Sequence, residues 1–313
     1  MQIITVKKRD ANQRLDKFLK KYFKVASVGF LYKMLRKKNI VLNGKKAEGA
    51  EILTANDEIK VFFSEETFKK MKGADVILKD PTPLKGFHLP IIFENEDILA
   101  VNKPAGMLTQ KGQKGDVSLN EHLLSYCLEN HILSEESLHM FRPSAMNRLD
   151  RNTSGIVLCA KTLKGAQYLS EALKSRTTEK TYHCIAAGRM EEELTFEGYL
   201  KKDEPNNRVT VSTQEMIDGK YIKTGFSPIR VYDGYTYLSV RLYTGRTHQI
   251  RANLSFLMHP VIGDPKYGDP VINRSYKEKY SVSHQLLHAA KIVLPGIGTI
   301  EATDPGEWKK LIL

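Results

Sequence analysis

The sequence predicts an α+β protein of two domains: a small N-terminal α/β domain and a larger domain built on a mixed, mainly antiparallel sheet. The 313 residues are enough for two domains of ordinary size. The charge is divided unevenly, because residues 1–72 hold 18 lysines and arginines against 8 acidic residues, whereas the remainder holds 30 against 28. From residue 88 onward, short β-rich runs alternate with helical ones, and neighbouring hairpin-like runs favour antiparallel pairing over a doubly wound sheet.

Composition and motif content exclude several classes of protein. The chain is 41% hydrophobic and 27% charged, as in soluble globular proteins. Residues Met1–Arg9 lack the apolar core of a secretory signal, and no apolar run approaches the roughly 20 residues that cross a bilayer, so we expect a cytoplasmic protein without a membrane partner. Cys127, Cys159 and Cys184 are widely spaced, and no HExxH motif is present, so we expect no disulfide framework and no metal.

The first predicted element is an amphipathic helix in residues 14–23. Leu15, Phe18, Leu19 and Tyr22 recur at helical spacing and form one apolar stripe, while the lysines of this segment lie on other faces. The positions of the apolar residues therefore predict a helix that packs on a small core.

A second helix and a small sheet complete the N-terminal domain. Ser27 is a good N-cap for a helix that buries Val28, Leu31 and Leu35 and carries cations near its C-terminal end. Residues 40–46 then predict a short strand running into an Asn-Gly turn, and residues 57–63 a closing strand. Residues 64–86 are charged, contain two prolines and show no sustained period, so we interpret them as a linker.

These elements resemble the S4 RNA-binding domain over about 50 residues. The pattern RLDKFL…LYKMLRKKNIVLNGKKA…DEIKVF carries the resemblance. We therefore expect an S4-like RNA-binding domain in residues 1–63, a linker in 64–86 and a catalytic domain in 87–313. The alternative, a solvated lysine surface without a partner, does not explain why almost all of the net charge of +12 gathers in the first quarter of the chain.

The second domain begins at about His88, and its elements are predicted in order. Strands are expected at 98–101, at 156–160 and from 180 onward, helices at 118–129 and 163–174, and a hairpin of 226–232 and 235–243 around Asp233-Gly234. A further helix follows residue 248, with Ile250, Leu254 and Leu257 as its core stripe.

The turn Asn147–Gly155 contains a candidate nucleophile, Asp150. It lies between Arg148 and Arg151, whose charges favour its ionised form, and an ionised, oriented carboxylate is a competent nucleophile. Thr153 and Ser154 can hydrogen-bond the turn backbone, and Gly155 permits an unusual φ or a close approach. Taken alone, the pattern is weak, because an aspartate between two arginines is more often part of a surface ion pair.

Two further clusters carry polar and aromatic groups. Residues Thr244–Arg251 place two arginines, a histidine and a glutamine at a strand-to-helix junction, which suits an anion site, although an ordinary helix start with exposed charge has the same composition. Residues Lys180–His183 open a strand and offer an aromatic ring that could stack on a base.

Together these blocks resemble the RluA-type pseudouridine synthases, along residues 88–304. The blocks are VNKPAGM (101–107), NRLDRNTSG (147–155), KTYHCIAAG (180–188), TGRTHQIR (244–251) and, further on, GDPKYGD and LLHAAKI, in the family's order. The chain looks closest to the branch that modifies large-subunit ribosomal RNA. The resemblance therefore implies an isomerase that converts uridine to pseudouridine during RNA modification.

The resemblance also assigns roles to single residues. Asp150 matches the nucleophile, Arg251 the arginine that pairs with it, and Tyr182 the tyrosine that packs on the base and is a candidate for proton abstraction. The matching substrate-binding positions are Arg148, which can fill the space that a flipped uridine vacates, and the pocket-lining Leu287. Apart from the resemblance, Lys103 and Arg246 are expected to bind the RNA backbone and to offset the cost of flipping the base. The reaction has no net redox change, so no organic cofactor is expected. Asn147 replaces the family's usual histidine, which puts the loop's orientation in question.

Several alternatives stay open at this point. Asp150 either attacks the sugar or assists elimination to a glycal. A non-catalytic RNA-binding or ribosome-assembly factor would keep the fold without the reaction, and an RNA hydrolase would need a second carboxylate near Asp150 or a metal cluster. GxGxxG and P-loop motifs are absent. No apolar stripe is left free for self-association, so we expect a monomer; the uridine that is modified depends on RNA shape.

Overall fold

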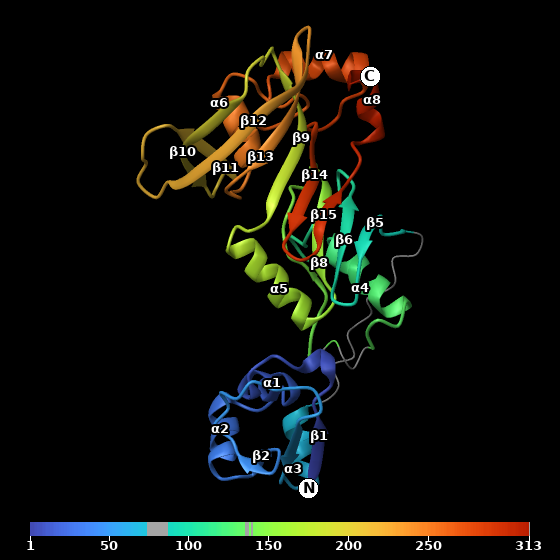
Figure 1. Cartoon of the computed structure of the whole chain (residues 1–313), viewed down its shortest axis with the longest axis vertical. Helices are drawn as coiled ribbons and strands as arrows, with labels where there is room; N and C mark the ends of the chain where they lie inside the picture. The colour runs from blue at the N-terminus through green and yellow to red at the C-terminus, as the bar shows by residue number, and fades with distance from the viewer. Residues whose placement is uncertain (74–86, 135–137, 139, 313) are drawn as a thin grey trace.

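The computed structural model describes residues 1–73, 87–134, 138 and 140–312. Its described part contains a four-stranded and an eleven-stranded sheet with helices packed on them, so the predicted α+β class is confirmed. The small N-terminal sheet and its helices lie at one end of an elongated molecule, and the large sheet extends through the rest (Figure 1). The side chain of Gln167 connects the two parts, since its amide donates to the carbonyl of Asn12 at 2.8 Å.

The N-terminal module is an antiparallel sheet covered by helices. Its strands run in the order β1-β4-β2-β3, with bounds Gln2–Thr5, Glu58–Val61, Ile40–Leu42 and Lys45–Lys46. The predicted helices are α1 (Leu15–Tyr22) and α2 (Val28–Arg36), and a short 3-10 turn, η1 (Lys8–Asp10), precedes them. The Ser27 hydroxyl caps α2 by accepting from the Phe30 N–H, as expected. Strand β1 was not predicted, because its four residues are too few to show an alternating pattern. Its pairing with β4 establishes it as a strand.

Two predictions for this region are wrong. Val28 is 54% exposed, because it lies in the first turn of α2 beyond the edge of the face that Phe30, Leu31 and Leu35 present to the core. Residues within the expected linker form a helix, α3 (Glu65–Lys72), capped by the Ser64 hydroxyl. Only two apolar side chains of α3 contact the module's core, too few for a detectable period. The rest of the expected linker, 74–86, lies outside the described residues.

The large sheet has the strand order β11-β10-β12-β13-β9-β14-β8-β6-β5. Among the described residues it is antiparallel except where β14 pairs with β8, which confirms the mainly antiparallel prediction. Strands β7 and β15 pair with β8 and β14, off this path. The bounds are β5 (Ile91–Glu94), β6 (Ile98–Lys103), β7 (Ser144–Ala145), β8 (Ser154–Ala160), β9 (Glu179–Ala187), β10 (Leu194–Asp203), β11 (Arg208–Ser212), β12 (Lys220–Tyr232), β13 (Tyr235–Leu242), β14 (Leu287–Leu294) and β15 (Gly298–Glu301).

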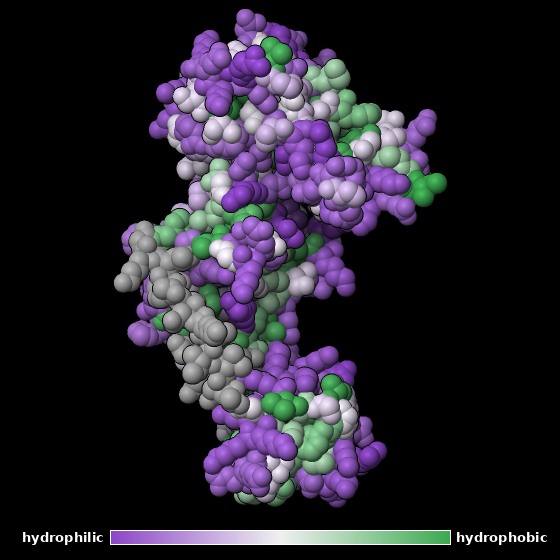
Figure 2. Space-filling view, turned by 180° about the vertical axis from the view of Figure 1, so that it is seen from behind, coloured by the Kyte–Doolittle hydropathy of each residue, from purple (hydrophilic) through white to green (hydrophobic). Residues whose placement is uncertain are grey.

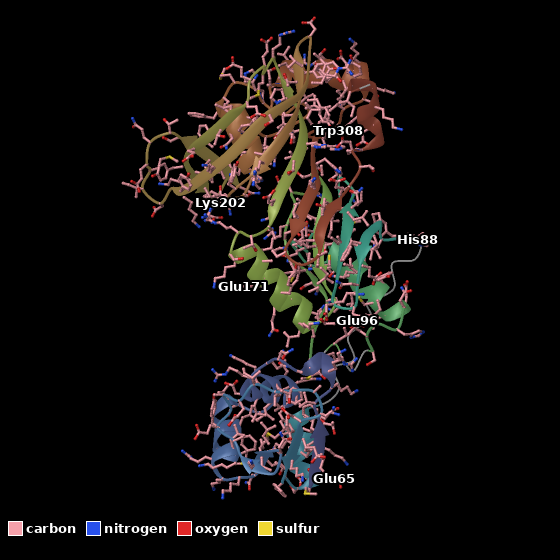
Figure 3. All side chains as sticks on the ribbon, viewed as in Figure 1. Glu65, His88, Glu96, Glu171, Lys202 and Trp308 are labelled. Carbon is pink, nitrogen blue, oxygen red and sulfur yellow. The ribbon has the colours of Figure 1, made fainter. Side chains whose placement is uncertain are left out.

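Helices pack on this sheet; those in residues 119–129, 163–174 and 249–256 lie near the predicted places, and the others were not predicted. They are α4 (Leu119–Glu129), α5 (Leu163–Lys174), α6 (Gln249–Phe256), α7 (Pro270–Tyr280), the turn η3 (Gly306–Trp308) and α8 (Lys309–Ile312). Trp308, labelled in Figure 3, is 1% exposed and packs with β9 and β13 residues. The view from behind in Figure 2 shows hydrophilic residues over most of that face and apolar ones in small patches. No described helix is both long and apolar enough to span a membrane.

The register of β9 and β14 decides which side chains meet at the centre of the sheet. Tyr182 is paired with Ala289 and Cys184 with Leu287. Because alternate residues share a face, Tyr182 and Leu287 lie on the same face, whereas His183 and His288 lie on the other. On that opposite face His183 bonds Asp304 at 2.7 Å, so the C-terminal segment covers it.

Candidate active site

An open cleft of about 840 Å³ lies where several segments of the second domain converge. They include the loop before β8, the start of β9, the β13–α6 junction and the loop after residue 263. A smaller pocket of about 70 Å³ adjoins it and shares its central residues. Asp150, Tyr182 and Arg251, which are distant in sequence, line both.

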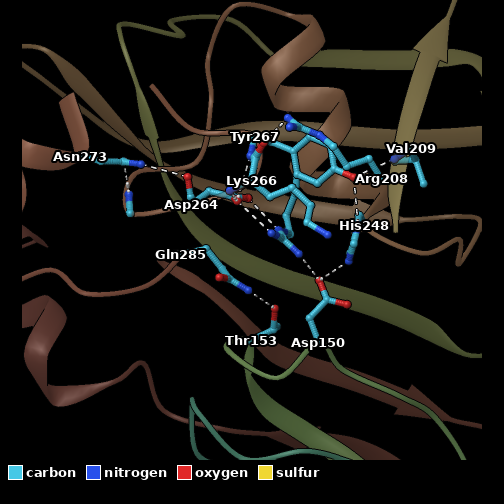
Figure 4. A network of polar contacts seen from close by, with 12 residues as sticks. Asp150, Thr153, Arg208, Val209, His248, Asp264, Lys266, Tyr267, Asn273 and Gln285 are labelled. Atoms are coloured by element: carbon cyan, nitrogen blue, oxygen red, sulfur yellow. Dashed lines mark hydrogen bonds and ion pairs between the residues drawn. The ribbon is translucent and has the colours of Figure 1, made fainter. Parts of the chain in front are cut away.

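The Asp150 carboxylate forms an ion pair with Arg251. The Arg251 Nη1 donates to Asp150 Oδ2 at 2.7 Å, and the Asp150 side chain is 29% exposed, so it is held and still accessible (Figure 4). The Arg251 side chain is only 6% exposed, since α6 is buried along this face. A charge-assisted hydrogen bond in so sheltered a place is short and directional.

A second, fully buried carboxylate, Asp264, holds Arg251 from the other side. It accepts from Arg251 Nε at 2.6 Å and from Nη2 at 2.8 Å, and the backbone N–H groups of Lys266 and Tyr267 donate to it at 2.8 and 3.1 Å. Burial by itself would raise the pKa of Asp264, but the Arg251 guanidinium and the backbone donors outweigh it, so the pKa lies below its ordinary value. Arg251 is thereby oriented before it meets Asp150.

Tyr182 and Leu287 supply an aromatic and an aliphatic wall beside Asp150. Leu287 is 4% exposed and lines the small pocket together with Tyr182 and Leu242. Within the described chain, no protein group hydrogen-bonds the Tyr182 hydroxyl. Burial, and then the negative charge of Asp150, raise the pKa of Tyr182, so the phenol keeps its proton at neutral pH. Such a pocket suits a flat, partly polar group.

The cleft is strongly cationic. Within the described part of the chain, Asp150 is the one acidic residue that lines it. The lysines and arginines that line it are Arg148, Arg151, Lys180, Lys202, Arg246, Arg251 and Lys266. Arg148 and Arg246 are exposed, as direct contact with a polyanion requires. Figure 3 labels Lys202, at the end of β10 that borders the cleft.

Lys103 does not fit the expected contact with the RNA backbone. The side chain is fully buried, and its ammonium donates to the carbonyls of Pro104, Met107 and Arg151 at 2.9, 2.9 and 3.1 Å. Burial lowers the pKa of Lys103 to about 8, and the charge of Asp150 opposes this shift. Lys103 therefore connects two loops beneath the cleft, and its charge is not presented to a ligand.

The loop that carries Asp150 is held by contacts partly different from those expected. Thr153 and Ser154 do not cap the turn through their hydroxyls: these bond Gln285 at 3.3 Å and His288 at 2.8 Å, across to the segment that leads into β14 and to β14 itself. Gly155 is needed as predicted, with φ of 107° and a virtual Cβ only 2.3 Å from the Ala289 carbonyl oxygen.

Asn147, the position that departs from the family pattern, connects the loop to β8. Its Nδ2 donates to the Ile156 carbonyl at 3.3 Å, and its Oδ1 accepts from the Leu158 N–H at 2.7 Å. The Asn147 amide therefore pairs with one backbone donor and one backbone acceptor of β8, and it fixes the start of the loop against this strand.

The side chains of the Thr244–Arg251 segment have different roles: some are buried and shape the turn, and others line the cleft. Gln249 is 2% exposed, and its Oε1 accepts from the Arg246 N–H at 3.0 Å, so it shapes the turn from inside. His248 lines the cleft and adopts the left-handed region, with φ of 55°. Its Nε2 lies 3.9 Å from Asp150 Oδ2.

Sequence reasoning assigned no role to Asp264 or Tyr267. Both belong to the block GDPKYGD, so the only signal was membership of that block. A buried acid between glycine and proline is typical of a turn, and nothing in its neighbours points to an arginine 13 residues earlier. The described residues contain no group of three or more His, Cys, Asp or Glu side chains that could hold a metal ion.

Comparison with known proteins identifies two families. The model of the RNA pseudouridylate synthase family matches residues 97–256, just over half of the chain, and the S4 domain model matches residues 13–59. The chain is 34% identical over 298 residues to an uncharacterized RNA pseudouridine synthase of Mycoplasma genitalium, covering 94% of this chain and 89% of that protein. It is 28% identical to the ribosomal large subunit pseudouridine synthase C of Escherichia coli K12, covering 96% and 91%.

Solved structures support the fold. Human RNA pseudouridylate synthase domain-containing protein 1 superposes with a TM-score of 0.54 at 23% identity, covering 70% of this chain and 83% of that one. The sequence matches extend over nearly the whole chain and include both domains. The chain therefore belongs to the RluA-type family of RNA pseudouridine synthases, which are isomerases, and carries an S4 RNA-binding domain at its N-terminus.

Proposed function

We propose that this enzyme isomerises a flipped-out uridine of large-subunit ribosomal RNA, with Asp150 as the reacting carboxylate. The observation that carries this proposal is the chain of contacts Asp150–Arg251–Asp264, which presents one partly exposed carboxylate in a cationic cleft beside Tyr182 and Leu287. A uracil cannot reach this cleft within a helix, so it must leave the stack at a cost of a few kcal/mol. The cations of the cleft and of the S4 domain offset that cost through phosphate contacts.

The proposed reaction balances without a redox partner. The bond between N1 and C1′ breaks, a bond between C5 and C1′ forms, C5 loses a proton and N1 gains one. Asp150 takes part at the ribose, either by attack at C1′ or by assisting elimination to a glycal, and both routes require the same carboxylate.

Tyr182 is proposed to hold the base by packing on it. Its raised pKa disfavours a resident phenolate, so the proton-abstracting role that the family resemblance also allows receives no support from the electrostatics of the site. A neutral phenol can still donate a hydrogen bond to a uracil oxygen while the ring covers the base.

Hydrolysis is disfavoured because the described residues that line the cleft include one carboxylate only. Enzymes that hydrolyse glycosidic bonds commonly use two carboxyl groups, roughly 5–9.5 Å apart, on either side of the bond. Among the described residues that line the cleft, Asp150 is the only acid, and Asp264 is fully buried behind Arg251. The site therefore suits a reaction in which one carboxylate assists both the cleavage of the old glycosidic bond and the formation of the new one.

The ribosomal target is proposed from the printed names of the relatives. Large-subunit pseudouridine synthases C of several bacteria are 28–29% identical over more than nine-tenths of this chain. We further propose a cytoplasmic monomer, since that compartment holds the ribosomal RNA; light scattering of the purified enzyme checks its mass against 35.6 kDa.

Asp150→Asn is the first test. It preserves the shape of the side chain and removes the charge, so we expect no tritium release from RNA labelled at C5 of uridine, with RNA affinity within a few-fold of wild type. Asp218→Asn, at an exposed aspartate, is the matched control and should retain full activity. Tritium release by Asp150→Asn at the wild-type rate contradicts the proposed role of this carboxylate.

The target is tested separately by mapping pseudouridines in cells with and without the gene. The expected result is the loss of one or more sites in large-subunit ribosomal RNA and their return with wild type but not with Asp150→Asn. A loss confined to transfer RNA overturns the target and leaves the chemistry intact.

A further inference from the structure

His248 is held beside Asp150 by a hydrogen-bond network that favours one arrangement of its ring protons. Its Nδ1 lies 2.9 Å from the Tyr267 hydroxyl, and that hydroxyl accepts from the Val209 N–H at 2.8 Å (Figure 4). The hydroxyl proton needs an acceptor, and within the described chain His248 Nδ1 is the acceptor in reach. When Tyr267 donates to Nδ1, the neutral imidazole carries its proton on Nε2.

Tyr267 is itself fixed in place from three sides. Its backbone N–H donates to Asp264, the Arg251 guanidinium lies 5.2 Å from the centre of its ring, and Arg208 lies 5.4 Å from that centre. The same buried residues that orient Arg251 thus orient the hydroxyl that bonds His248.

The Nε2 of His248 faces the oxygen of Asp150 that is already bound to Arg251. The distance from Nε2 to Asp150 Oδ2 is 3.9 Å, whereas Arg251 Nη1 lies at 2.7 Å from the same atom. Ordinary hydrogen bonds span about 2.7–3.2 Å, so a movement of less than about 1 Å closes this contact. Both donors then act on Oδ2, and Oδ1 is left without a hydrogen-bond partner among the residues that the structure describes.

The backbone of His248 supports a role beyond packing. It is the N-cap residue of α6 yet makes no side-chain cap, and it adopts the left-handed region, which costs a non-glycine residue free energy. That conformation directs the imidazole into the cleft and away from the helix end. The charged groups facing the ring are Asp150, Arg251, Asp264 and Lys266, and burial lowers its pKa against the opposing effect of Asp150.

We propose that His248 is a positioning residue for the isomerisation: its Nε2–H, selected by Tyr267, holds one oxygen of Asp150 against Arg251 and leaves the other oxygen for the ribose. This inference rests on Asp150 being the reacting carboxylate. A histidine that only filled space would have no need of a defined tautomer.

The tautomer is measured first, on the intact wild-type enzyme. Long-range proton–nitrogen correlation spectra of histidine-labelled protein should show His248 at pH 7 as the neutral form protonated on Nε2. Tyr267→Phe should remove this preference without removing the ring. A wild-type His248 that is protonated on Nδ1, or on both nitrogens, overturns the proposal without reference to activity.

Kinetics then test the effect of the donor on Asp150. We expect His248→Ala to lower kcat about 10- to 100-fold with KM within about threefold, since hydrogen bonds to charged groups contribute on that scale. His248→Gln, whose amide can place an N–H near the position of Nε2, should recover part of kcat. His88→Ala, at an exposed histidine labelled in Figure 3, is the control and should match wild type.

The two proposals fail in different ways. An active Asp150→Asn variant overturns the proposed function. An inactive Asp150→Asn variant beside a fully active His248→Ala variant overturns only the role of His248. Equal loss of kcat in the alanine and glutamine variants, with unchanged melting temperatures, also contradicts a hydrogen-bonding role.

Discussion

At the scale of single residues, Arg251 shares its guanidinium between two carboxylates of different character. Asp264 is fully buried and takes two of the donors, whereas Asp150 is partly exposed and takes one. The buried acid therefore neutralises Arg251 enough to keep it inside the fold, and the remaining donor orients the exposed acid. A charged pair of this kind is costly to break because the partner left behind stays buried.

Asp264→Asn should destabilise the catalytic domain by about 3 kcal/mol at pH 7, because it leaves the Arg251 charge buried with less compensation. Urea unfolding followed by fluorescence of the single tryptophan, Trp308, reports on this domain, where that residue is buried. Since the pKa of Asp264 is lowered in the folded state, its contribution is present above the ordinary value of about 4 and is lost as the pH falls through the lower folded-state value. The gap between wild type and variant should therefore persist from pH 8 to about 5 and shrink below about 4. A gap that grows on acidification contradicts this assignment.

Lys103 and Arg246 should respond differently to salt, although both are cations near Asp150. Arg246→Met removes an exposed charge of the cleft, so the slope of log K against log salt for RNA binding should fall by roughly 0.7–0.9. Lys103→Met removes a buried charge that donates to three carbonyls, so the slope should stay the same while kcat and melting temperature fall. A reduced slope for Lys103→Met would instead support the phosphate contact that was expected from the sequence.

At the scale of elements, the parallel pairing of β8 with β14 depends on one glycine. These strands form the parallel pair of the described sheet, and Gly155 is in register with Ala289. A Cβ at Gly155 would lie 2.3 Å from a backbone oxygen, which cannot rotate away as a side chain could. The strand that follows Asp150 can therefore approach β14 only without a side chain at this position.

Gly155→Ala should destabilise the catalytic domain by about 3 kcal/mol or more, from the clash and the positive φ together. It should also reduce activity, because the displaced strand carries the loop of Asp150. Gly306→Ala, in the same domain, meets no atom within 4 Å and should shift unfolding by less than about 0.5 kcal/mol. Equal stability of the two variants in the tryptophan unfolding assay would contradict the packing described for Gly155.

Many of the elements could be predicted from the sequence because their signals are local. The N-cap at Ser27, the Asn-Gly turn with φ of 50° and 74°, and the apolar stripe of α6 each depend on residues within two helical turns. Strands β5, β10, β11 and β14 and helix α7 were not predicted. Strand β1 and helix α3 also escaped prediction, because each has few apolar residues and depends on contacts with the rest of the S4 module.

At the scale of the whole molecule, charge and chemistry are carried by different parts of the chain. The segment 1–72 has a balance of +10, and the remainder has +2. Helix α2, which carries exposed lysines and an arginine near its C-terminal end, lies at the opposite end of the elongated molecule from α6 (Figure 1). Binding of RNA and isomerisation of the base should therefore be separable.

Replacing Lys33, Arg36 and Lys37 together by glutamine should lower the salt slope of RNA binding by about 2–3, if each neutralises one phosphate, and raise KM. Chemistry at saturating RNA should be unchanged, because these residues do not line the cleft. Changing Arg274, Lys277 and Lys279 of α7 removes the same charge elsewhere and should leave the slope within about 1 of wild type. Equal effects of the two triple variants would show that net charge, not the S4 surface, sets the affinity.

The sequence by itself determined the α+β class, the basic N-terminal domain, many of the elements and the family, since these follow from local periodicity, turn chemistry, charge and the order of motifs. Only the tertiary structure decided that Asp264 orients Arg251, that Lys103 is buried beneath the cleft, and that His248 faces Asp150. Each of these depends on contacts between residues separated by 13, 48 or 98 positions, or on burial. No local pattern encodes which buried groups meet, because the packing of the whole chain brings them together.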